Sequence, residues 1–238
     1  MNDLLRRAVT AHGGLDRWTT FIDIEARFSI KGTSAPFRSM GEALGPVTFL
    51  AATREECAVI RPFLMEDHIG FFEPNYVSIE TFDEQVLEHR DQPHATYVRR
   101  ATGVAWDSFD FLYFCGYTLW TSLTTPFLYT YPGFESEELA PVEEAGEEWR
   151  RLSVLLPAHI ACHSPRQICY FGPDGLLRRQ DHISSVLGDV VREDVSVYDE
   201  FDGIIVPSVR QLYQPVSGNG RSNEAALVVI ELDAVAFR

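Results

Sequence analysis

The segment between Trp106 and Tyr129 is too long and too apolar to be a single β-strand. It reads WDSFDFLYFCGYTLWTSLTTPFLY, in which Asp107 or Ser108 is suited to cap a helix and Pro126 to stop one. Between these bounds apolar residues fall on every side of a helix, and such a helix has to be buried all round. We therefore expect a buried helix over 106–124, with the rest of the chain built around it.

Most of the remaining chain has the residue period of β-strands. From Ile22 to Lys31 apolar residues alternate with charged or polar ones, which is typical of a half-buried antiparallel strand. The Gly-Pro-Asp-Gly sequence at 172–175 predicts a tight hairpin turn. Short runs divided by turn signals predict further strands near 36–44, 47–52, 57–61, 67–72, 76–82, 85–90, 149–155, 167–171, 176–186, 190–198, 204–213 and 225–237.

So many strands with so few helices restrict the architecture. A short first helix can be capped by Asn2 or Asp3 and ended by Gly13-Gly14. Large twisted sheets curl or close, and the apolar helix must then fill the concave face. We expect a mainly β chain forming a single domain over 1–238: a curved antiparallel sheet, or half-barrel, wrapped around a buried helix, with an N-terminal helix. A pocket between helix and sheet would suit an apolar or aromatic small molecule.

The composition excludes several classes of partner. The net charge of −15 and the pI of about 4.8 disfavour a basic face for nucleic acid or anionic lipid. The longest apolar stretch, 109–120, is much shorter than the ~20 residues that span a bilayer, so we expect no membrane insertion. The N-terminus lacks the apolar run of a signal peptide, which predicts a cytoplasmic protein. The seven glutamates of 135–148 predict a solvated loop and strand edge.

Motifs for cofactors and metals are missing from the chain. It contains no G-x-G-x-x-G, G-x-x-x-x-G-K-[ST], H-E-x-x-H or G-x-S-x-G pattern. The nearest metal-like cluster is His159, Cys162 and His163, but on a strand Cys162 would point away from the two histidines. We therefore expect no cofactor and no metal.

Two groups of residues are candidates for a site. On the expected helix, Tyr113, Tyr117, Trp120 and Thr124 share one face, and polar-tipped aromatic rings suit a pocket or an ordinary core. His163 is a further candidate for ligand binding and His68 a weaker one.

The second group lies on the hairpin after residue 166. In its second strand Gln180 and His182 share one face, whereas Arg179 and Asp181 share the other, and the sequence leaves open which face lines the cavity. We take His182, Asp181 and Tyr117 as candidate catalytic residues, because histidine titrates near pH 6.5 and can move protons. The candidate ligand-binding residues are Tyr113, Trp120, Thr124, Tyr170, Arg179 and His163.

The runs GGLDRW (13–18), YFCGYTLWTSLTTPF (113–127), YFGPDGLLRRQDH (170–182) and FDGIIVPSVRQLY (201–213) resemble a bacterial family of similar length. The order of helix, meander, inserted helix and FGPDGLL hairpin is also similar to the lipoprotein-carrier fold of LolA and LolB type. That resemblance implies a half-barrel, which holds acyl chains in periplasmic carriers and directs a cofactor-free rearrangement in a cytoplasmic enzyme of violacein biosynthesis. The missing export signal separates this chain from the carriers.

Three functional interpretations follow. The first is a cofactor-independent cytoplasmic enzyme that catalyses cyclisation, isomerisation or dehydration of an apolar or aromatic molecule, in which orientation does most of the work. The second is a non-catalytic carrier or sensor of a hydrophobic ligand, and the third is a structural or interaction protein; a homodimer is compatible with each. An enzyme should place at least two of His182, Asp181 and Tyr117 within hydrogen-bond reach in one cavity, whereas a carrier should have an apolar cavity and a structural protein a filled core.

Overall fold

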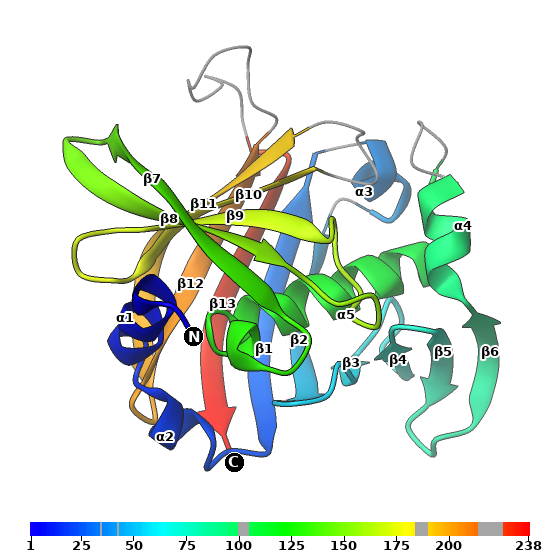
Figure 1. Ribbon diagram of the computed structural model, residues 1–238. Coiled ribbons are helices and arrows are strands. Elements are labelled where there is room, and N and C mark those ends of the chain that lie inside the picture. Colours follow the sequence, from blue (N-terminus) through cyan, green and yellow to red (C-terminus); the bar gives the residue numbers. More distant parts are fainter. Residues whose placement is uncertain (34, 42, 100–104, 184–189, 214–225) are drawn as a thin grey trace.

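A single curved antiparallel sheet wraps around one long helix (Figure 1). The computed structural model describes residues 1–33, 35–41, 43–99, 105–183, 190–213 and 226–238. Within them, thirteen strands are hydrogen-bonded in the order β6-β5-β4-β3-β2-β1-β13-β12-β11-β10-β9-β8-β7. The expected mainly β half-barrel with an N-terminal helix is confirmed.

The elements follow the chain in this order: α1 (Asp3–Ala11), α2 (Leu15–Trp18), β1 (Asp23–Gly32), α3 (Ala35–Ser39), β2 (Ala43–Ala52), β3 (Ala58–Arg61), β4 (His68–Glu73), β5 (Tyr76–Thr81), β6 (Val86–Asp91), α4 (Pro93–Arg99), α5 (Ser108–Thr124), the 3-10 helix η1 (Phe127–Thr130), β7 (Glu135–Glu144), β8 (Glu147–Leu155), β9 (Arg166–Phe171), β10 (Leu177–Ile183), β11 (Val190–Phe201), β12 (Ile204–Tyr213) and β13 (Val228–Phe237).

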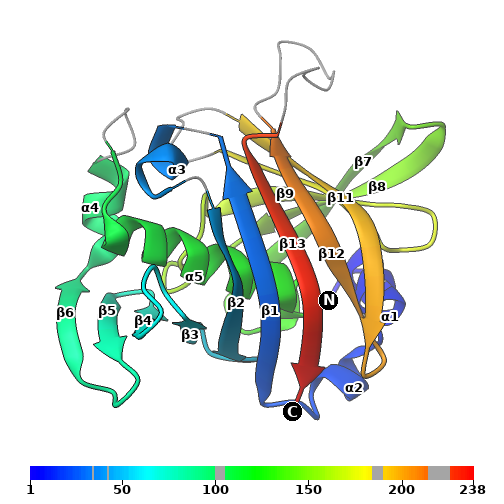
Figure 2. The ribbon, with the colours of Figure 1, turned by 180° about the vertical axis from the view of Figure 1, so that it is seen from behind.

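The helix α5 forms where the sequence predicts it. Asp107 accepts hydrogen bonds from the backbone N–H groups of Phe109 and Asp110, and the Asp110 carboxylate accepts one from the Asp107 N–H, which together make a capping box. Arg90 of β6 donates to both carboxylates and so ties this end of α5 to the sheet. Both ribbon views show α5 lying across the concave face of the sheet (Figures 1 and 2).

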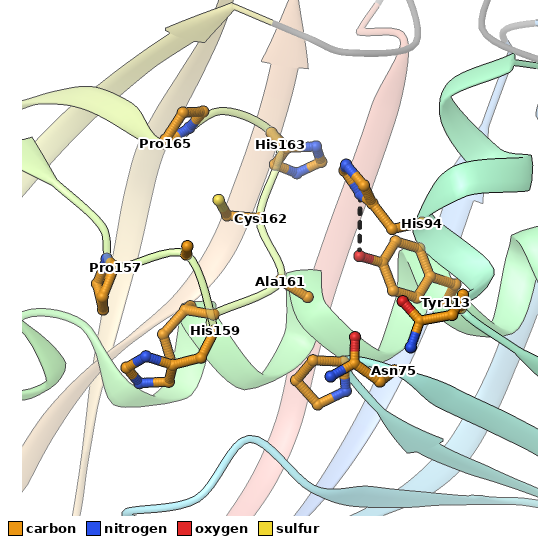
Figure 3. Close-up of a pocket in the computed structure, with 13 residues that line it drawn as sticks. Asn75, His94, Tyr113, Pro157, His159, Ala161, Cys162, His163 and Pro165 are labelled. Carbon is orange, nitrogen blue, oxygen red and sulfur yellow. Dashed lines mark hydrogen bonds between the residues drawn. The ribbon is translucent and has the colours of Figure 1, made fainter.

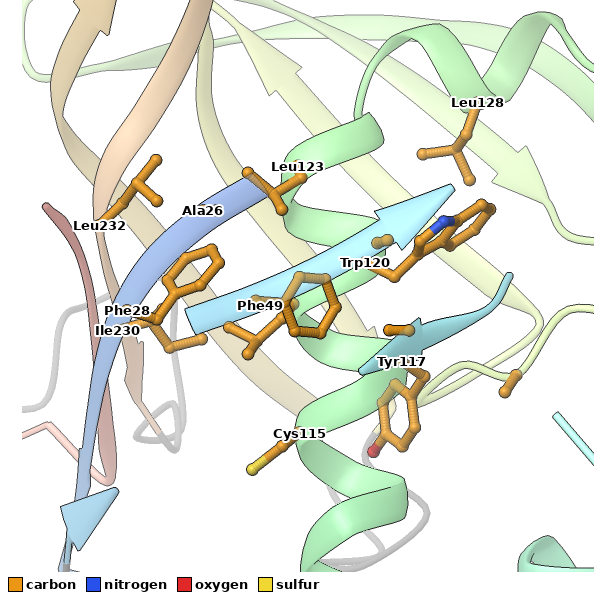
Figure 4. Close-up of a cluster of buried hydrophobic side chains, with 14 of the residues drawn as sticks. Ala26, Phe28, Phe49, Cys115, Tyr117, Trp120, Leu123, Leu128, Ile230 and Leu232 are labelled. Atoms are coloured by element: carbon orange, nitrogen blue, oxygen red, sulfur yellow. The ribbon is translucent and has the colours of Figure 1, made fainter. Parts of the chain in front are cut away.

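Two glycines let α5 approach the sheet closely. A Cβ built on Gly116 would lie 2.2 Å from the Phe72 ring of β4, and one on Gly70 would lie 2.5 Å from Leu112. Large apolar side chains fill the space beside this contact, among them Phe28, Phe49 and Trp120, all nearly inaccessible to solvent (Figure 4). The helix is therefore positioned by dry packing against β1–β4.

Several details differ from the sequence predictions. The expected strand over 36–44 is replaced by α3 and the start of β2, and α4 was not expected at all. Ile22 is 71% exposed and lies before β1, although Ile24 and the alternate residues after it are buried as predicted. The glutamate-rich segment, expected as a loop and strand edge, forms the β7–β8 hairpin, in which β7 is the edge strand of the sheet and the register shifts between Leu139 and Val142. Parts of two expected strands, 184–186 and 225, lie outside the described residues.

The predicted ends of the first helix and the predicted hairpin turn at 172–175 are both present. Asn2 caps α1 through its side chain, and Gly13 and Gly14 follow the helix with positive φ values of 119° and 86°. The hairpin turn at 172–175 closes with a hydrogen bond from the Gly175 N–H to the Gly172 carbonyl. No helix in the described part of the chain is long and apolar enough to cross a membrane.

Candidate functional site

A pocket of about 530 Å³ opens at the end of the half-barrel near α4. Four segments that are far apart in sequence build it: the β4–β5 turn, the β6–α4 junction, the middle of α5 and the loop between β8 and β9 (Figure 3). The described residues that line it are Pro74, Asn75, Gln92, His94, Tyr113, Pro157, Ala158, His159, Ile160, Ala161, Cys162, His163 and Pro165.

One wall is the 157–165 loop, whose lining is mostly proline, alanine, isoleucine and cysteine. Its shape is held from both ends, because the Leu156 N–H donates to the Pro165 carbonyl over 2.7 Å. Its centre is held from below by the buried Glu56, which accepts a hydrogen bond from the Ala161 N–H over 2.7 Å. Burial raises the pKa of the Glu56 carboxyl well above its usual range, so the neutral form is favoured.

The opposite wall is polar. The Tyr113 hydroxyl and Nδ1 of His94 are 3.3 Å apart and share a hydrogen bond at the pocket surface (Figure 3). Burial raises the pKa of Tyr113, so its phenol stays protonated. Gln92 lies beside them with a left-handed φ of 48°, and its backbone N–H donates to the Asn75 carbonyl, which joins the two rim segments. Left-handed backbone is uncommon for a residue other than glycine, and it is concentrated at functional sites.

A chain of buried hydrogen bonds runs inward from the pocket. Nδ1 of His163 lies 2.9 Å from the Tyr117 hydroxyl, which in turn lies 2.9 Å from the Tyr97 hydroxyl. Burial, and to a lesser extent the nearby His182, lowers the pKa of His163 well below its ordinary value. The imidazole is therefore neutral at pH 7 and can accept a hydrogen bond from Tyr117.

His182 stacks on His163 with ring centroids 4.3 Å apart and planes only 12° from parallel. Neither ring nitrogen of His182 has a hydrogen-bond partner among the described residues, although the side chain is buried. Burial lowers its pKa, against the opposing influence of Glu193 and Asp181. Gln180, two residues before His182 on β10, donates a hydrogen bond to the Gln167 side chain of β9.

Beside His163 lies a small polar cavity of only about 10 Å³, which Cys162 and His163 share with the pocket. Arg210 and Glu193 form an ion pair there, and Arg210 also donates to the Ser122 carbonyl of α5. The cavity is too small to hold more than about one water molecule. At this point little room is left between α5 and the sheet.

The structure decides which face of β10 lies inward. Gln180 and His182 face α5, whereas Arg179 and Asp181 lie on the outer face. There Asp181 accepts hydrogen bonds from Arg179 at 2.6 Å and from the Tyr170 hydroxyl at 2.9 Å, while Arg179 also pairs with Glu144. The two groups proposed from the hairpin are thus separated by the thickness of the sheet.

The candidate residues on α5 do not all lie at the pocket. Tyr113 lines the pocket and Tyr117 lies one hydrogen bond behind it, through His163. Trp120 donates to the Ala52 carbonyl in the apolar core, and Thr124 donates to the Trp120 carbonyl within the helix. His68 is a partly buried residue of β4 beside the exposed Asp67. Of the nine candidate catalytic and ligand-binding residues, only Tyr113 and His163 therefore line the pocket as described.

Sequence reasoning missed other members of this site, namely His94, Asn75, Gln92 and Glu56. One signal was present: Pro157 and Pro165 bracket a loop with two histidines and a cysteine, a composition unlike that of the neighbouring strands. From this loop His163 is selected as a ligand-binding candidate, and His159, Cys162 and His163 are otherwise treated as a possible metal cluster. No group of three His, Cys, Asp or Glu residues in the described ranges is arranged to hold a metal ion.

The comparisons with known proteins are informative at the level of structure alone. No protein-family description matches the chain, and no curated protein is similar to it in sequence. A LolA superfamily protein from Nitrosomonas europaea superposes with a TM-score of 0.54 at 8% identity, over 99% of this chain and 92% of that one. A DUF1329 family protein from Desulfovibrio piger gives 0.52 at 12% identity, over 98% and 91%.

A third solved structure, a domain from Vibrio parahaemolyticus described as an outer membrane lipoprotein-sorting protein, gives a TM-score of 0.51 at 8% identity over 99% of this chain and 91% of that one. At these identities the likeness establishes the fold. The chain therefore has a LolA-like half-barrel fold, as its order of elements predicts. The resemblance to the violacein-pathway enzyme stays a prediction.

Proposed function

We propose that this protein binds a small hydrophobic molecule in the 530 Å³ pocket and acts as a non-catalytic carrier or sensor. The pocket itself is the observation that carries the proposal. Its volume is within the 300–1,000 Å³ that is usual for small-molecule sites, and one wall is largely apolar. Both walls are held in place by hydrogen bonds from the surrounding backbone, so ligand binding needs little reorganisation.

The positions of the candidate catalytic residues favour a carrier over an enzyme, although the pocket has one polar wall and is not the wholly apolar cavity expected of a carrier. His182 and Asp181 lie on opposite faces of β10, and Tyr117 is bonded to Tyr97 and His163. None of these three is among the described residues that line the pocket. Proton transfer needs groups that reach the bound molecule at about 2.6–3.2 Å, directly or through one water.

The descriptions of the structural neighbours support a carrier. The packing inside this chain restricts the positions that a ligand could occupy. The Vibrio parahaemolyticus domain is described as a lipoprotein-sorting protein, and the Nitrosomonas europaea protein as a LolA superfamily protein. In this chain the space between α5 and β1–β3 is occupied by Phe28, Phe49 and Trp120 (Figure 4). We therefore place the ligand at the mouth of the half-barrel, beside α5, rather than along the helix.

Titration with a neutral fluorescent probe such as N-phenylnaphthylamine tests this proposal. The wild-type protein should bind the probe saturably, and Ala158→Trp, which puts an indole in the pocket wall, should weaken binding by at least about tenfold. Ala234→Trp is the matched control, because Ala234 is an exposed residue of β13 that does not line the pocket. Equal binding by both variants would show that the probe binds elsewhere, and no saturable binding would refute the proposal.

A further inference from the structure

The pocket is polar without carrying a permanent charge. Among its described lining residues, the hydrogen-bonding side chains are those of Asn75, Gln92, His94, Tyr113, His159 and His163. These are amides, imidazoles and a phenol. The first residue beyond the loop, Arg166, donates to Ser153 of β8 and does not line the pocket. A charged ligand would therefore meet no fixed counter-charge there.

A charged head group would be disfavoured at such a site for two reasons. Moving an ion out of water is costly unless a partner of opposite charge replaces its hydration. A carboxylate would also meet the field of a protein with a net charge of −15. A cationic head would find no carboxylate among the described lining residues, and the buried Glu56 carboxyl is engaged with the Ala161 N–H of the loop.

A neutral head group, in contrast, finds both kinds of hydrogen-bonding partner. The Tyr113–His94 pair uses one hydrogen bond internally and still has a donor and an acceptor free, whichever of the two atoms donates. The side-chain amides of Asn75 and Gln92 form no hydrogen bond with another described residue, and they supply further donors and acceptors in the pocket. Figure 3 shows Asn75 on the same side of the pocket as Tyr113 and His94. The 157–165 wall, which is largely apolar apart from His159 and His163, lies opposite and suits a hydrocarbon body.

We infer that the ligand is an apolar molecule with one uncharged head that both donates and accepts hydrogen bonds, such as an alcohol or a primary amide, and is neither a free fatty acid nor an amine. This inference rests on the proposed function of the pocket. It adds a selectivity that the fold does not specify, because the lining residues come from loops, from His94 at the start of α4 and from one position of α5.

Competition against the bound naphthylamine probe at about pH 8, where decanoic acid is ionised, tests the selectivity. Decanol and decanamide should displace the probe at concentrations at least about tenfold lower than decanoate or decyltrimethylammonium, all used below their micelle concentrations. Equal or better competition by either charged compound would overturn the inference and leave the proposed function intact. If the probe does not bind at all, the proposed function fails and this inference fails with it.

A single added charge tests whether the lining sets the selectivity. Asn75→Lys places an ammonium group on the polar wall and should raise the affinity for decanoate relative to decanol by about tenfold. Gln85→Lys is the matched control: it changes the net charge equally at the exposed far end of the β5–β6 hairpin. If both variants favour decanoate equally, overall charge and not the pocket lining sets the preference, and the inference is wrong.

Discussion

The two sides of α5 meet the same sheet in different ways. Towards β1–β4 the contact is dry, and Gly116 and Gly70 bring backbone and rings together without space for a methyl group. Towards β9–β12 the inner face carries Gln167, Gln180 and His182, with the Glu193–Arg210 ion pair beyond them. We call these the apolar half and the polar half of the concave face.

The difference between the halves explains where the pocket lies. Close packing against the apolar half fixes the position of α5. The polar half cannot close on the helix in the same way, because buried polar groups have to find partners at specific distances. His182 of the polar half stacks on His163, where the hydrogen-bond chain from Tyr97 and Tyr117 reaches the pocket next to Tyr113. The pocket opens at that point.

The largest expected loss of stability follows from breaking the Glu193–Arg210 ion pair of the polar half. Arg210→Met leaves Glu193 buried without its cation and should lower the free energy of unfolding by about 3–5 kcal/mol, measured by urea denaturation. Adding Glu193→Leu to this variant should recover most of the loss, since an apolar pair replaces an ionic one. If the double variant is no more stable than Arg210→Met, the cost does not come from the unpaired carboxylate.

The apolar half should resist an added methyl group. Alanine is a better helix former than glycine by about 1 kcal/mol, yet Gly116→Ala would push a methyl group into the Phe72 ring. We expect a net loss of about 1–3 kcal/mol in the free energy of unfolding. A second variant, Gly116→Ala with Phe72→Leu, should be more stable than the single one. A gain in stability for Gly116→Ala alone would contradict the close contact.

The polar half should make stability depend on pH. The pKa values of His163 and His182 are lowered by burial, so between about pH 6.5 and their folded-state values only the unfolded chain binds these protons. Stability is therefore lost as the pH falls below about 6.5. His182→Leu should reduce this slope by up to about 1.4 kcal/mol per pH unit, the contribution of one proton.

The same variant should be at least as stable as the wild type at about pH 8, where it removes two buried nitrogens that have no partner in the described structure. Measuring the difference between variant and wild type cancels the opposing contribution of Glu56. The pKa of Glu56 is raised, so the stability it contributes is present at low pH and lost as the pH rises. An unchanged pH slope in His182→Leu would show that His182 is not buried neutral.

The smallest expected effect concerns the inner end of the hydrogen-bond chain. Tyr97→Phe removes the partner that lies 2.9 Å from the Tyr117 hydroxyl, while Tyr117 keeps His163 as a second partner. We expect a loss of about 0.5–1.5 kcal/mol in the free energy of unfolding and unchanged probe binding, since Tyr97 does not line the pocket. A large drop in probe affinity would show that the chain, and not the pocket walls, controls binding.

The comparison also shows which features the sequence could predict. The apolar half was predictable because its signals are local: the Asp107 cap, the Pro126 stop and the alternation after Ile22 each describe one element. The strand expected over 36–44 failed because a few alternating apolar residues fit a short helix equally well. The inward face of β10 could not be chosen, since both of its faces are polar and burial had to come from the rest of the sheet.

The pocket was less predictable than the fold because its residues meet only through the sheet order. Tyr113 and His163 were found by residue type, whereas Asn75 and Gln92 are ordinary turn residues in the sequence. They reach the pocket because β5 pairs with both β4 and β6, which brings the β4–β5 turn next to the end of β6. Glu56 was missed since a glutamate that follows Arg54 and Glu55 in a charged turn gives no sign that it will be buried.

A crystal structure of the protein grown with decanol tests the central claim most directly. We predict electron density for the alcohol in the pocket, with its hydroxyl within hydrogen-bond distance of the Tyr113–His94 pair and its chain against the 157–165 loop. Density lying between α5 and β1–β3 with the core displaced, or an empty pocket at a decanol concentration that displaces the probe, would contradict the claim.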